Sequence, residues 1–297
     1  MGDQKYQSSG KRHRSTAAAD ALVSELPSDL RHAVLLAQEK GASSWLTSLP
    51  VREHGFALHK GAFRDALALR YGWIPKDFPV ECICGKNFTV EHALSCNRGG
   101  FPTLRHNEIR DTTASLLTEV CSNVAVEPAL QELNGESFSC KSANRDIGAR
   151  VDIAVDGFWG PGRERTFIDV RVFNPFAPTN RKTSISSSYR SHEREKKRQY
   201  TQRVCEVEHG SFSPLVFSSS GGMAKEATVF YKRLAALLAE RWDQPCSVTM
   251  GWLRCTLGFS LLRSSIQCIR GARSSKSRPV CYLPVDLIHS ECGFTLP

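Results

Sequence analysis

Four side chains of metal-binding type gather in the stretch ECICGKNFTVEHALSCNRGG, residues 81–100. His92 and Cys96 are spaced four apart, which places both on one side of a helical turn. Cys82 and Cys84 precede a glycine, where a turn would fold both thiolates onto one ion. Three thiolates and one imidazole complete the tetrahedral shell of Zn²⁺, which is typical of a closed, structural site. The alternative is a pair of core cysteines beside a surface histidine, because a single residue separates the first two thiolates.

Two carboxylates occur in the middle of apolar strand patterns. Asp152 lies in ARVDIAV and Asp169 in TFIDVRVF, where a lone carboxylate is costly to bury without a cation. Acids from adjacent strands can converge on one Mg²⁺ or Mn²⁺, and metal-bound water is a nucleophile for phosphodiester hydrolysis. Glu108, in the preceding helical stretch, is a candidate third carboxylate. Taken singly, the acids have a simpler interpretation as strand-end side chains that face solvent or pair with Arg150 and Arg171.

A charged helical stretch supplies candidate cations. In YRSHEREKKRQY, Lys196 or Lys197 could orient the attacking water or meet the scissile phosphate, and Tyr200 lies one turn later. Arg105 and His106, in LRHNEIRD, are candidate phosphate contacts or helix caps. The default interpretation of such a charged helix is a solvated face. The candidate DNA contacts are therefore Arg105, His106, Arg150 and Tyr200.

The stretches around these residues change from helical to strand periodicity and back. Residues 19–75 and 105–124 have apolar residues at three-to-four spacing, which predicts helices. The resulting order is helix, three strands, helix, strand, helix, and it predicts a mixed α/β sheet covered by helices. The predicted strands are 124–130, 150–159 and 165–175, which Asn174-Pro175 ends, and a fourth strand with a Gly-rich turn occupies 212–222. A polar loop, 177–188, precedes the first of the later helices, which are 189–208, 223–242 and 247–271.

The composition favours an intracellular protein with an anionic partner. The chain has 297 residues and a net charge of +9, which points to nucleic acid ahead of a membrane surface. Its 11 cysteines are odd in number and irregular in spacing, which does not suggest a disulfide framework. No apolar run reaches membrane-spanning length, and the first residues lack the apolar region of a signal peptide. We therefore expect a nuclear or cytoplasmic protein that is neither secreted nor membrane-bound.

Together these residues resemble the C-terminal region of a non-LTR retrotransposon protein, in which a zinc knuckle precedes a restriction-enzyme-like endonuclease of the PD-(D/E)XK fold. The resemblance covers roughly residues 40–245 and rests on the order of knuckle, RHN helix start, and two acidic strands. The knuckle matches the Cys/His set of residues 81–100. The family's R/K-P-D motif corresponds to Arg150-Val151-Asp152, its second acid to Asp169, and its downstream Lys and Tyr to Lys196 or Lys197 and Tyr200.

The sequence departs from the family's pattern at three points. Val151 stands in place of the motif's Pro, and Arg171 stands where the wider superfamily often has its catalytic lysine. Arginine keeps the charge but does not readily give up a proton, so activity would depend on a lysine from the later helix. The F/Y-x-D-D motif of the upstream polymerase does not occur, and the helical stretch before the knuckle resembles the linker that follows the polymerase. The resemblance therefore implies a truncated, element-derived reading frame.

The resemblance implies a DNA endonuclease that nicks its target. Asp152 and Asp169, with Glu108 assisting, would hold Mg²⁺ or Mn²⁺, zinc would be structural, and the partner would be DNA or element RNA. Two alternatives are a catalytically inactive nucleic-acid-binding relic and a folded reading frame without function. The implied organisation is a disordered basic N-terminus (1–18), a helical linker (19–78), the zinc knuckle (79–100), the endonuclease domain (101–245), a C-terminal helix (246–272) and an irregular tail (273–297).

Overall fold

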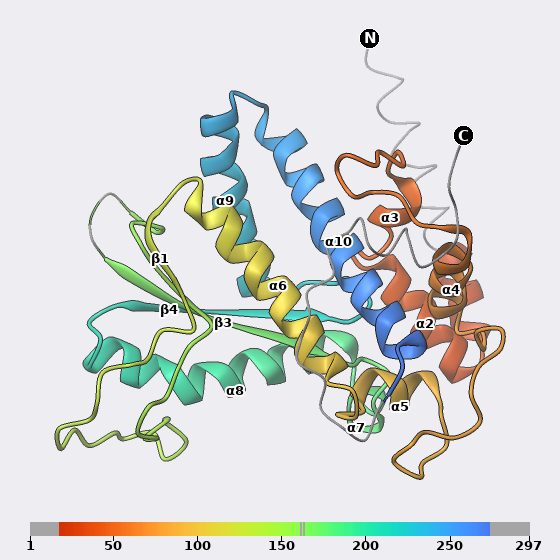
Figure 1. The fold of residues 1–297 in the computed structure, drawn as a ribbon, viewed down its shortest axis with the longest axis horizontal. Coiled ribbons are helices and arrows are strands. Elements are labelled where there is room, and N and C mark those ends of the chain that lie inside the picture. The colour runs from red at the N-terminus through yellow and green to blue at the C-terminus, as the bar shows by residue number, and fades with distance from the viewer. Residues whose placement is uncertain (1–17, 161, 163, 274–297) are drawn as a thin grey trace.

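The computed structural model describes residues 18–160, 162 and 164–273. Helices surround one sheet, and the chain forms a helical segment and a short Cys/His segment before strands and helices alternate (Figure 1). Residues 18–25 are also helical. The further helices are α2 (Ser28–Gln38), α3 (Ser44–Thr47), α4 (Lys60–Tyr71), α5 (Val90–Ser95), α6 (Phe101–Thr118), α7 (Pro178–Arg181), α8 (Ile185–Glu206), α9 (Lys225–Trp242) and α10 (Cys246–Arg270).

The sheet is mixed, and its four strands lie in the order in which the chain forms them. The first three are successively antiparallel, and the last runs parallel to the third. A parallel pair needs a long crossover, which α8 supplies between the third and fourth strands. The predicted order of strands and helices is confirmed. The strands are β1 (Ser122–Val126), β2 (Ile153–Asp156), β3 (Arg165–Phe173) and β4 (Ser211–Ser218).

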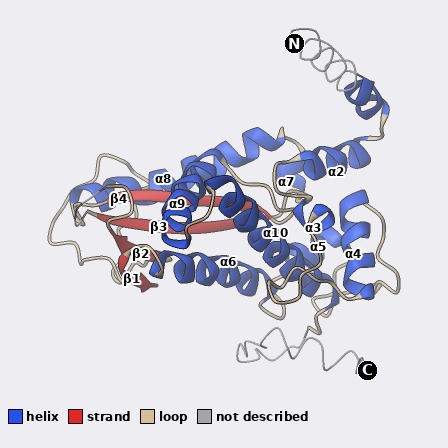
Figure 2. Cartoon of the chain, turned by 90° about the horizontal axis from the view of Figure 1, so that it is seen from above, coloured by secondary structure: helices blue, strands red, loops and turns tan. Residues whose placement is uncertain are grey.

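Side chains alternate across β3, so its two faces are covered by different helices. Ile168 and Val170 point into a large apolar cluster to which α6, α9 and α10 contribute. Phe167 and Phe173 point to the opposite face, where they pack with residues of α8. The predicted mixed α/β sheet flanked by helices is therefore confirmed (Figure 1, Figure 2).

A long irregular stretch, residues 127–152, separates β1 from β2 and folds against α8. Arg203 of α8 is fully buried and holds this stretch by its backbone. Its guanidinium donates to the carbonyls of Gln131 at 2.8 Å, Asp146 at 3.0 Å and Asn144 at 3.2 Å.

Helix α10 joins the N-terminal helices to the sheet. Leu253, Leu257 and Leu261 belong to the cluster under the sheet, whereas Phe259 stacks on Phe56 before α4 with ring centroids 5.2 Å apart. The helix predicted at 247–271 therefore shares its core with the region assigned to the endonuclease, and the predicted boundary at 245 does not separate two cores.

The predicted disordered N-terminus and irregular tail lie almost wholly outside the described residues. Two smaller features of the described part differ from the sequence analysis. The polar stretch before α8, predicted as a loop, contains the short helix α7. The bounds of two strands also differ, because β1 spans Ser122–Val126 rather than 124–130 and β2 spans Ile153–Asp156 rather than 150–159. Among the described residues, no helix combines the length and the apolar character that crossing a bilayer requires.

Candidate active site and metal centre

The candidate active site lies at the N-terminal end of β2, where the neighbouring strand β3 continues beyond it. β2 pairs with β3 from Asp156 opposite Arg165 to Ile153 opposite Ile168. The backbone N–H of Asp152, one residue before β2, still donates to the carbonyl of Ile168 at 3.1 Å. Its carboxylate Oδ2 accepts the N–H of Val170 at 2.6 Å, so this side chain continues the hydrogen bonding with β3 beyond the first residue of β2. The result is a notch in the sheet, which we call the acid notch.

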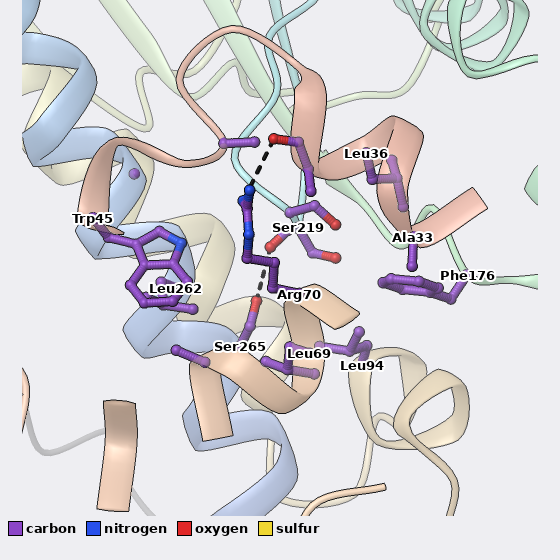
Figure 3. Close-up of a pocket in the computed structure, with 15 residues that line it drawn as sticks. Ala33, Leu36, Trp45, Leu69, Arg70, Leu94, Phe176, Ser219, Leu262 and Ser265 are labelled. Carbon is purple, nitrogen blue, oxygen red and sulfur yellow. Dashed lines mark hydrogen bonds between the residues drawn. The ribbon is translucent and has the colours of Figure 1, made fainter. Parts of the chain in front are cut away.

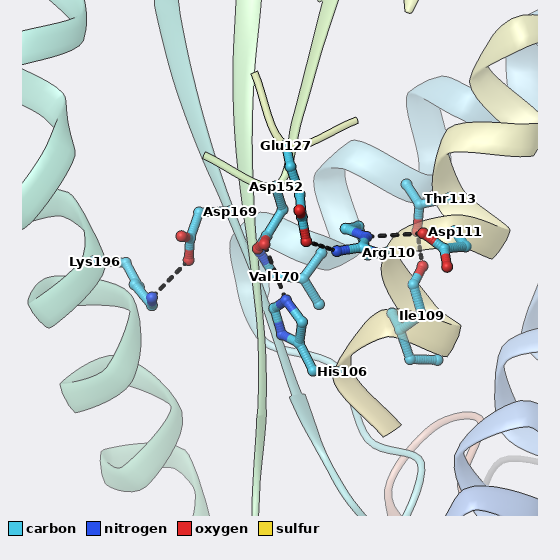
Figure 4. Close-up of polar contacts among 10 residues, drawn as sticks. All are labelled: His106, Ile109, Arg110, Asp111, Thr113, Glu127, Asp152, Asp169, Val170 and Lys196. Carbon is cyan, nitrogen blue, oxygen red and sulfur yellow. Dashed lines mark hydrogen bonds and ion pairs between the residues drawn. The ribbon is translucent and has the colours of Figure 1, made fainter. Parts of the chain in front are cut away.

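Asp169 reaches the acid notch from β3. Its side chain points to the α8 face of the sheet, and only 5% of the residue is exposed. Lys196 of α8 forms an ion pair with it, with Nζ 2.8 Å from Oδ2. Figure 4 shows Asp152, Asp169 and Lys196 around the same stretch of β3. The structure thus brings together two acids from adjacent strands and selects Lys196, rather than its neighbour, as the lysine that pairs with Asp169.

In the acid notch, the nearby positive charge does not fully compensate the two carboxylates. Burial raises the pKa of Asp169 to about 6, the charge of Lys196 opposes this rise, and the negative charge of Asp152 adds to it. A raised carboxyl pKa of this origin means that the ionised form lacks compensating positive charge. Further positive charge at the notch would therefore favour the ionised form of Asp169.

His106 of α6 closes the notch on the side opposite α8. Its Nε2 lies 2.9 Å from Oδ1 of Asp152, so both carboxylate oxygens of Asp152 have a partner. The side chain of His106 remains 29% exposed. The sequence analysis offered this residue as a phosphate contact or a helix cap, and the structure places it against the acid instead.

Two further predicted site residues on α6 point elsewhere. Glu108 accepts a hydrogen bond from Ser260 Oγ of α10 at 3.0 Å, because two residues along a helix turn the side chain by about 200° from His106. The prediction that it joins the acid pair is therefore wrong. Arg105 is 2% exposed and donates to the carbonyl of Leu94 at 3.2 Å. Burial lowers its pKa, and its predicted DNA contact is also wrong.

The two remaining candidates of α8 differ in their distance from the acids. Lys197 points outward and pairs with Glu226 at 2.8 Å, so it does not reach the acids. Tyr200 is half-buried, and Nζ of Lys196 lies 5.7 Å from its ring centre. Burial raises the pKa of Tyr200, and the negative charge of Asp169 adds to this rise.

Both predicted arginine partners of the acids pair with other groups. Arg171 of β3 lies 3.3 Å from Glu195 of α8 rather than from Asp169. Arg150 is exposed and donates to the carbonyl of Glu127 at 2.7 Å. The interpretation of the acids as simple partners of these two arginines is therefore wrong.

Two residues beside the notch were not recognised in the sequence. Glu127, directly after β1, donates its N–H to the carbonyl of Asp152 at 2.9 Å. Its carboxylate contacts Arg110 of α6 (Figure 4). Arg110 follows His106 by four residues, and this spacing could have placed both on the side of α6 that faces the sheet. The sequence did not indicate Glu127 as a site residue, because it lies within the predicted strand 124–130.

The four predicted zinc ligands converge in the structure. One ligand atom from each of Cys82, Cys84, His92 and Cys96 lies within 4.8 Å of the others. Sγ of Cys82 is 3.8 Å from Sγ of Cys96, and Sγ of Cys84 is 3.4 Å from Nε2 of His92. This Cys/His cluster could hold a metal ion such as zinc, because three thiolates and one imidazole form a tetrahedral donor set. The alternative of two core cysteines beside a surface histidine does not describe this convergence.

The Cys/His segment is fixed to the end of β3. Asn174 follows β3 and donates from Nδ2 to the carbonyl of Glu91 at 2.9 Å and to Ser95 Oγ at 2.8 Å. Arg105, at the start of α6, holds the carbonyl of Leu94. Asn174 lies five residues after Asp169, about 17 Å along an extended strand, so β3 connects the Cys/His segment to the acid notch.

A small cavity lies between the N-terminal helices, α10 and the end of β4, as Figure 3 shows. It has a volume of about 50 Å³, and most of its lining side chains are apolar. Arg70, Ser219 and Ser265 add polar groups, and Ser265 Oγ donates to the carbonyl of Ser219 at 3.1 Å. No residue of the acid notch lines this cavity. Its size suits a few water molecules at a packing junction.

Comparisons with known proteins assign no family to this arrangement. No family model matches the chain, and no curated protein is found to be similar to it. The function is therefore argued from the geometry of the site.

Proposed function

We propose that the protein is a restriction-enzyme-like endonuclease of the PD-(D/E)XK type, which uses a divalent cation to hydrolyse phosphodiester bonds of DNA. The observation that carries this proposal is the acid notch. Asp152 and Asp169 come from adjacent strands, and Lys196 is the ammonium group that pairs with Asp169. The order of helix, three strands, helix and strand around them supports the same family.

The donor set of the notch suits Mg²⁺ or Mn²⁺. These ions take oxygen ligands, and Mg²⁺ usually binds through one or two carboxylates while it keeps several waters. Asp152 and Asp169 would hold the cation, whose chemistry is to lower the pKa of bound water and stabilise charge on the phosphate. The raised pKa of Asp169 supports this assignment, because added positive charge would offset the burial of its carboxylate.

The residues of the chain have separate tasks in this proposal. The imidazole of His106 and the N–H of Val170 fix the orientation of Asp152. Lys196 would neutralise charge at the scissile phosphate, and Tyr200 would support its position through the ring contact. The Cys/His cluster, loaded with zinc, would hold its segment beside the DNA.

The same arrangement supports descent from a non-LTR retrotransposon protein, with nuclear DNA as the substrate. The knuckle, the helix with His106 and the two acidic strands follow one another as in that family. An alternative is a catalytically inactive, nucleic-acid-binding relic of a mobile element. Arg171 favours this alternative, because it occupies the usual position of the catalytic lysine and pairs with Glu195.

Plasmid nicking with Mg²⁺ or Mn²⁺ tests the proposal. The wild type is compared with the double variant Asp152→Ala, Asp169→Ala, and DNA binding of both proteins is measured without the divalent cation. We expect nicking by the wild type alone, with equal or tighter DNA binding by the variant because two negative charges are removed. DNA binding without nicking by either protein would leave the inactive relic as the function.

A further inference from the structure

Helix α8 distributes its charges unequally between its two sides. Between Ile185 and Glu206 it carries six Lys or Arg and three Glu residues. Two of the acids have partners on neighbouring elements. Glu193 is buried and accepts the N–H of Glu226 at the start of α9 at 2.9 Å, and Glu195 pairs with Arg171 of β3. Neither Glu193 nor Glu195 therefore pairs with the Lys and Arg side chains on the outward side of the central turns of α8.

Three arginines form a row on that outward side. Arg190, Arg194 and Arg198 are all exposed and follow one another at intervals of four residues. This interval places successive Cα atoms about 6 Å apart along the axis on nearly the same side of the helix. We call this row the α8 ridge. Lys197 borders the ridge but pairs with Glu226.

The α8 ridge faces away from the acid notch. Lys196 points inward to Asp169, and Arg194 and Arg198 are each two residues from it. They therefore project about 160–200° around the helix from Lys196, on the far side of a cylinder about 10–12 Å wide. A phosphate at the notch and a phosphate at the ridge thus cannot be the same one. Figure 1 shows α8 as the outer layer on its side of the sheet.

We propose that the α8 ridge is a second, non-catalytic DNA-binding surface that contacts the phosphate backbone of a duplex segment outside the notch. Exposed guanidinium groups suit this partner because they bind phosphate oxygens in a bidentate manner and release condensed counterions. The inference rests on the proposed function, since it concerns how the same DNA substrate is held. The other interpretation of the ridge is a solvated helix face.

The test compares two triple variants of the full chain that each remove three positive charges. The ridge variant carries Arg190→Gln, Arg194→Gln and Arg198→Gln. The control variant carries Arg64→Gln, Lys232→Gln and Arg241→Gln, which are exposed positions on α4 and α9. Circular dichroism and thermal unfolding verify that both variants are folded. Binding of a fluorescent 30-base-pair duplex is then measured by anisotropy across a salt series without Mg²⁺.

We expect the ridge variant to bind the duplex roughly 10-fold or more weakly at moderate salt. The slope of log affinity against log salt should become shallower by about 2–3, since each lost phosphate contact removes about 0.9. The control variant should keep the wild-type affinity and slope. Equal behaviour of the two variants would overturn the ridge as a binding surface.

Nicking by the same proteins separates this inference from the proposed function. If the wild type binds DNA through the α8 ridge but does not nick it with Mg²⁺ or Mn²⁺, the proposed endonuclease function is contradicted and the DNA-binding role of the ridge is supported. A wild type that nicks, with a ridge variant that binds as the wild type does, would overturn the ridge alone.

Discussion

At the scale of single residues, Lys196 and Lys197 are neighbours in sequence but have opposite environments. Lys196 is half-buried and pairs with Asp169, whereas Lys197 is exposed and pairs with Glu226. We therefore expect Lys196→Ala to lower the rate of Mn²⁺-supported plasmid nicking by about 100-fold or more, as is typical for loss of an electrostatic contact at the reacting group. Lys197→Ala serves as the matched control and should change the rate by less than about threefold. Similar losses in both variants would remove Lys196 from the mechanism.

Arg203 gives a residue-scale prediction about stability. It is fully buried and donates to three backbone carbonyls of the irregular stretch 127–152. Arg203→Met keeps much of the side-chain volume but leaves these carbonyls without their donor, so we expect the free energy of unfolding to fall by roughly 3 kcal/mol. Urea unfolding monitored by fluorescence measures the change. Arg198→Met, exposed on the same helix, should alter the free energy by less than about 0.5 kcal/mol.

The sequence allowed some of these residues to be predicted and not others. Asp152 and Asp169 stood out because a carboxylate is rare inside an apolar strand pattern. On α6, Glu108 and Arg105 were chosen wrongly from their charge alone, because weak amphipathicity does not reveal which side of a helix meets the sheet. His106 was named as a phosphate contact, but its hydrogen bond with Asp152 became evident only once β2 was placed beside α6.

At the scale of elements, the Cys/His segment is too short to be stable alone. Its helix α5 spans six residues, below the length at which an isolated helix persists, and few apolar side chains accompany it. We therefore expect one zinc ion per chain, measured by mass spectrometry of the purified protein. Cys96→Ser should lose the zinc and lower the melting temperature, since metal binding contributes folding free energy. Cys246→Ser, at an exposed free cysteine, should change neither, and unchanged zinc content in Cys96→Ser would exclude the site.

The helices and strands could be predicted from the spacing of apolar residues, whereas the segments that connect them and the packing of α10 could not. The four strands and the long helices had clear apolar patterns of period two or three to four. Helix α7 was missed because four residues are too few to show a period, and the polar stretch around it was predicted as a loop. The packing of α10 against both the sheet and the N-terminal helices depends on contacts such as Leu257 and Phe259, which no local pattern specifies.

At the scale of the whole molecule, the N-terminal helices are joined to the sheet by polar contacts that include a buried carboxylate. Glu39, at the end of α2, accepts from the hydroxyl of Tyr189 of α8 at 3.1 Å and from Ser218 Oγ of β4 at 3.4 Å. Gly222 makes this approach possible, because a Cβ at that position would collide with both Glu39 and Tyr189. Asp65 and Arg270 form a second link, between α4 and α10, at 2.6 Å. The helical segment and the sheet are therefore expected to unfold together.

The carboxylate of Glu39 makes this junction sensitive to pH. Burial raises its pKa from 4.5 to about 7, although the hydrogen bonds from Tyr189 and Ser218 oppose the rise. The protonated form is therefore favoured in the folded state, so the stabilisation is fully present below about pH 4.5 and is lost as the pH rises through 7. The free-energy change is on the order of 3 kcal/mol. Glu39→Gln cannot ionise, so its unfolding free energy relative to the wild type should rise between pH 5 and pH 8. The exposed Glu53→Gln is the control, and a difference for Glu39→Gln that does not vary with pH would contradict the assignment.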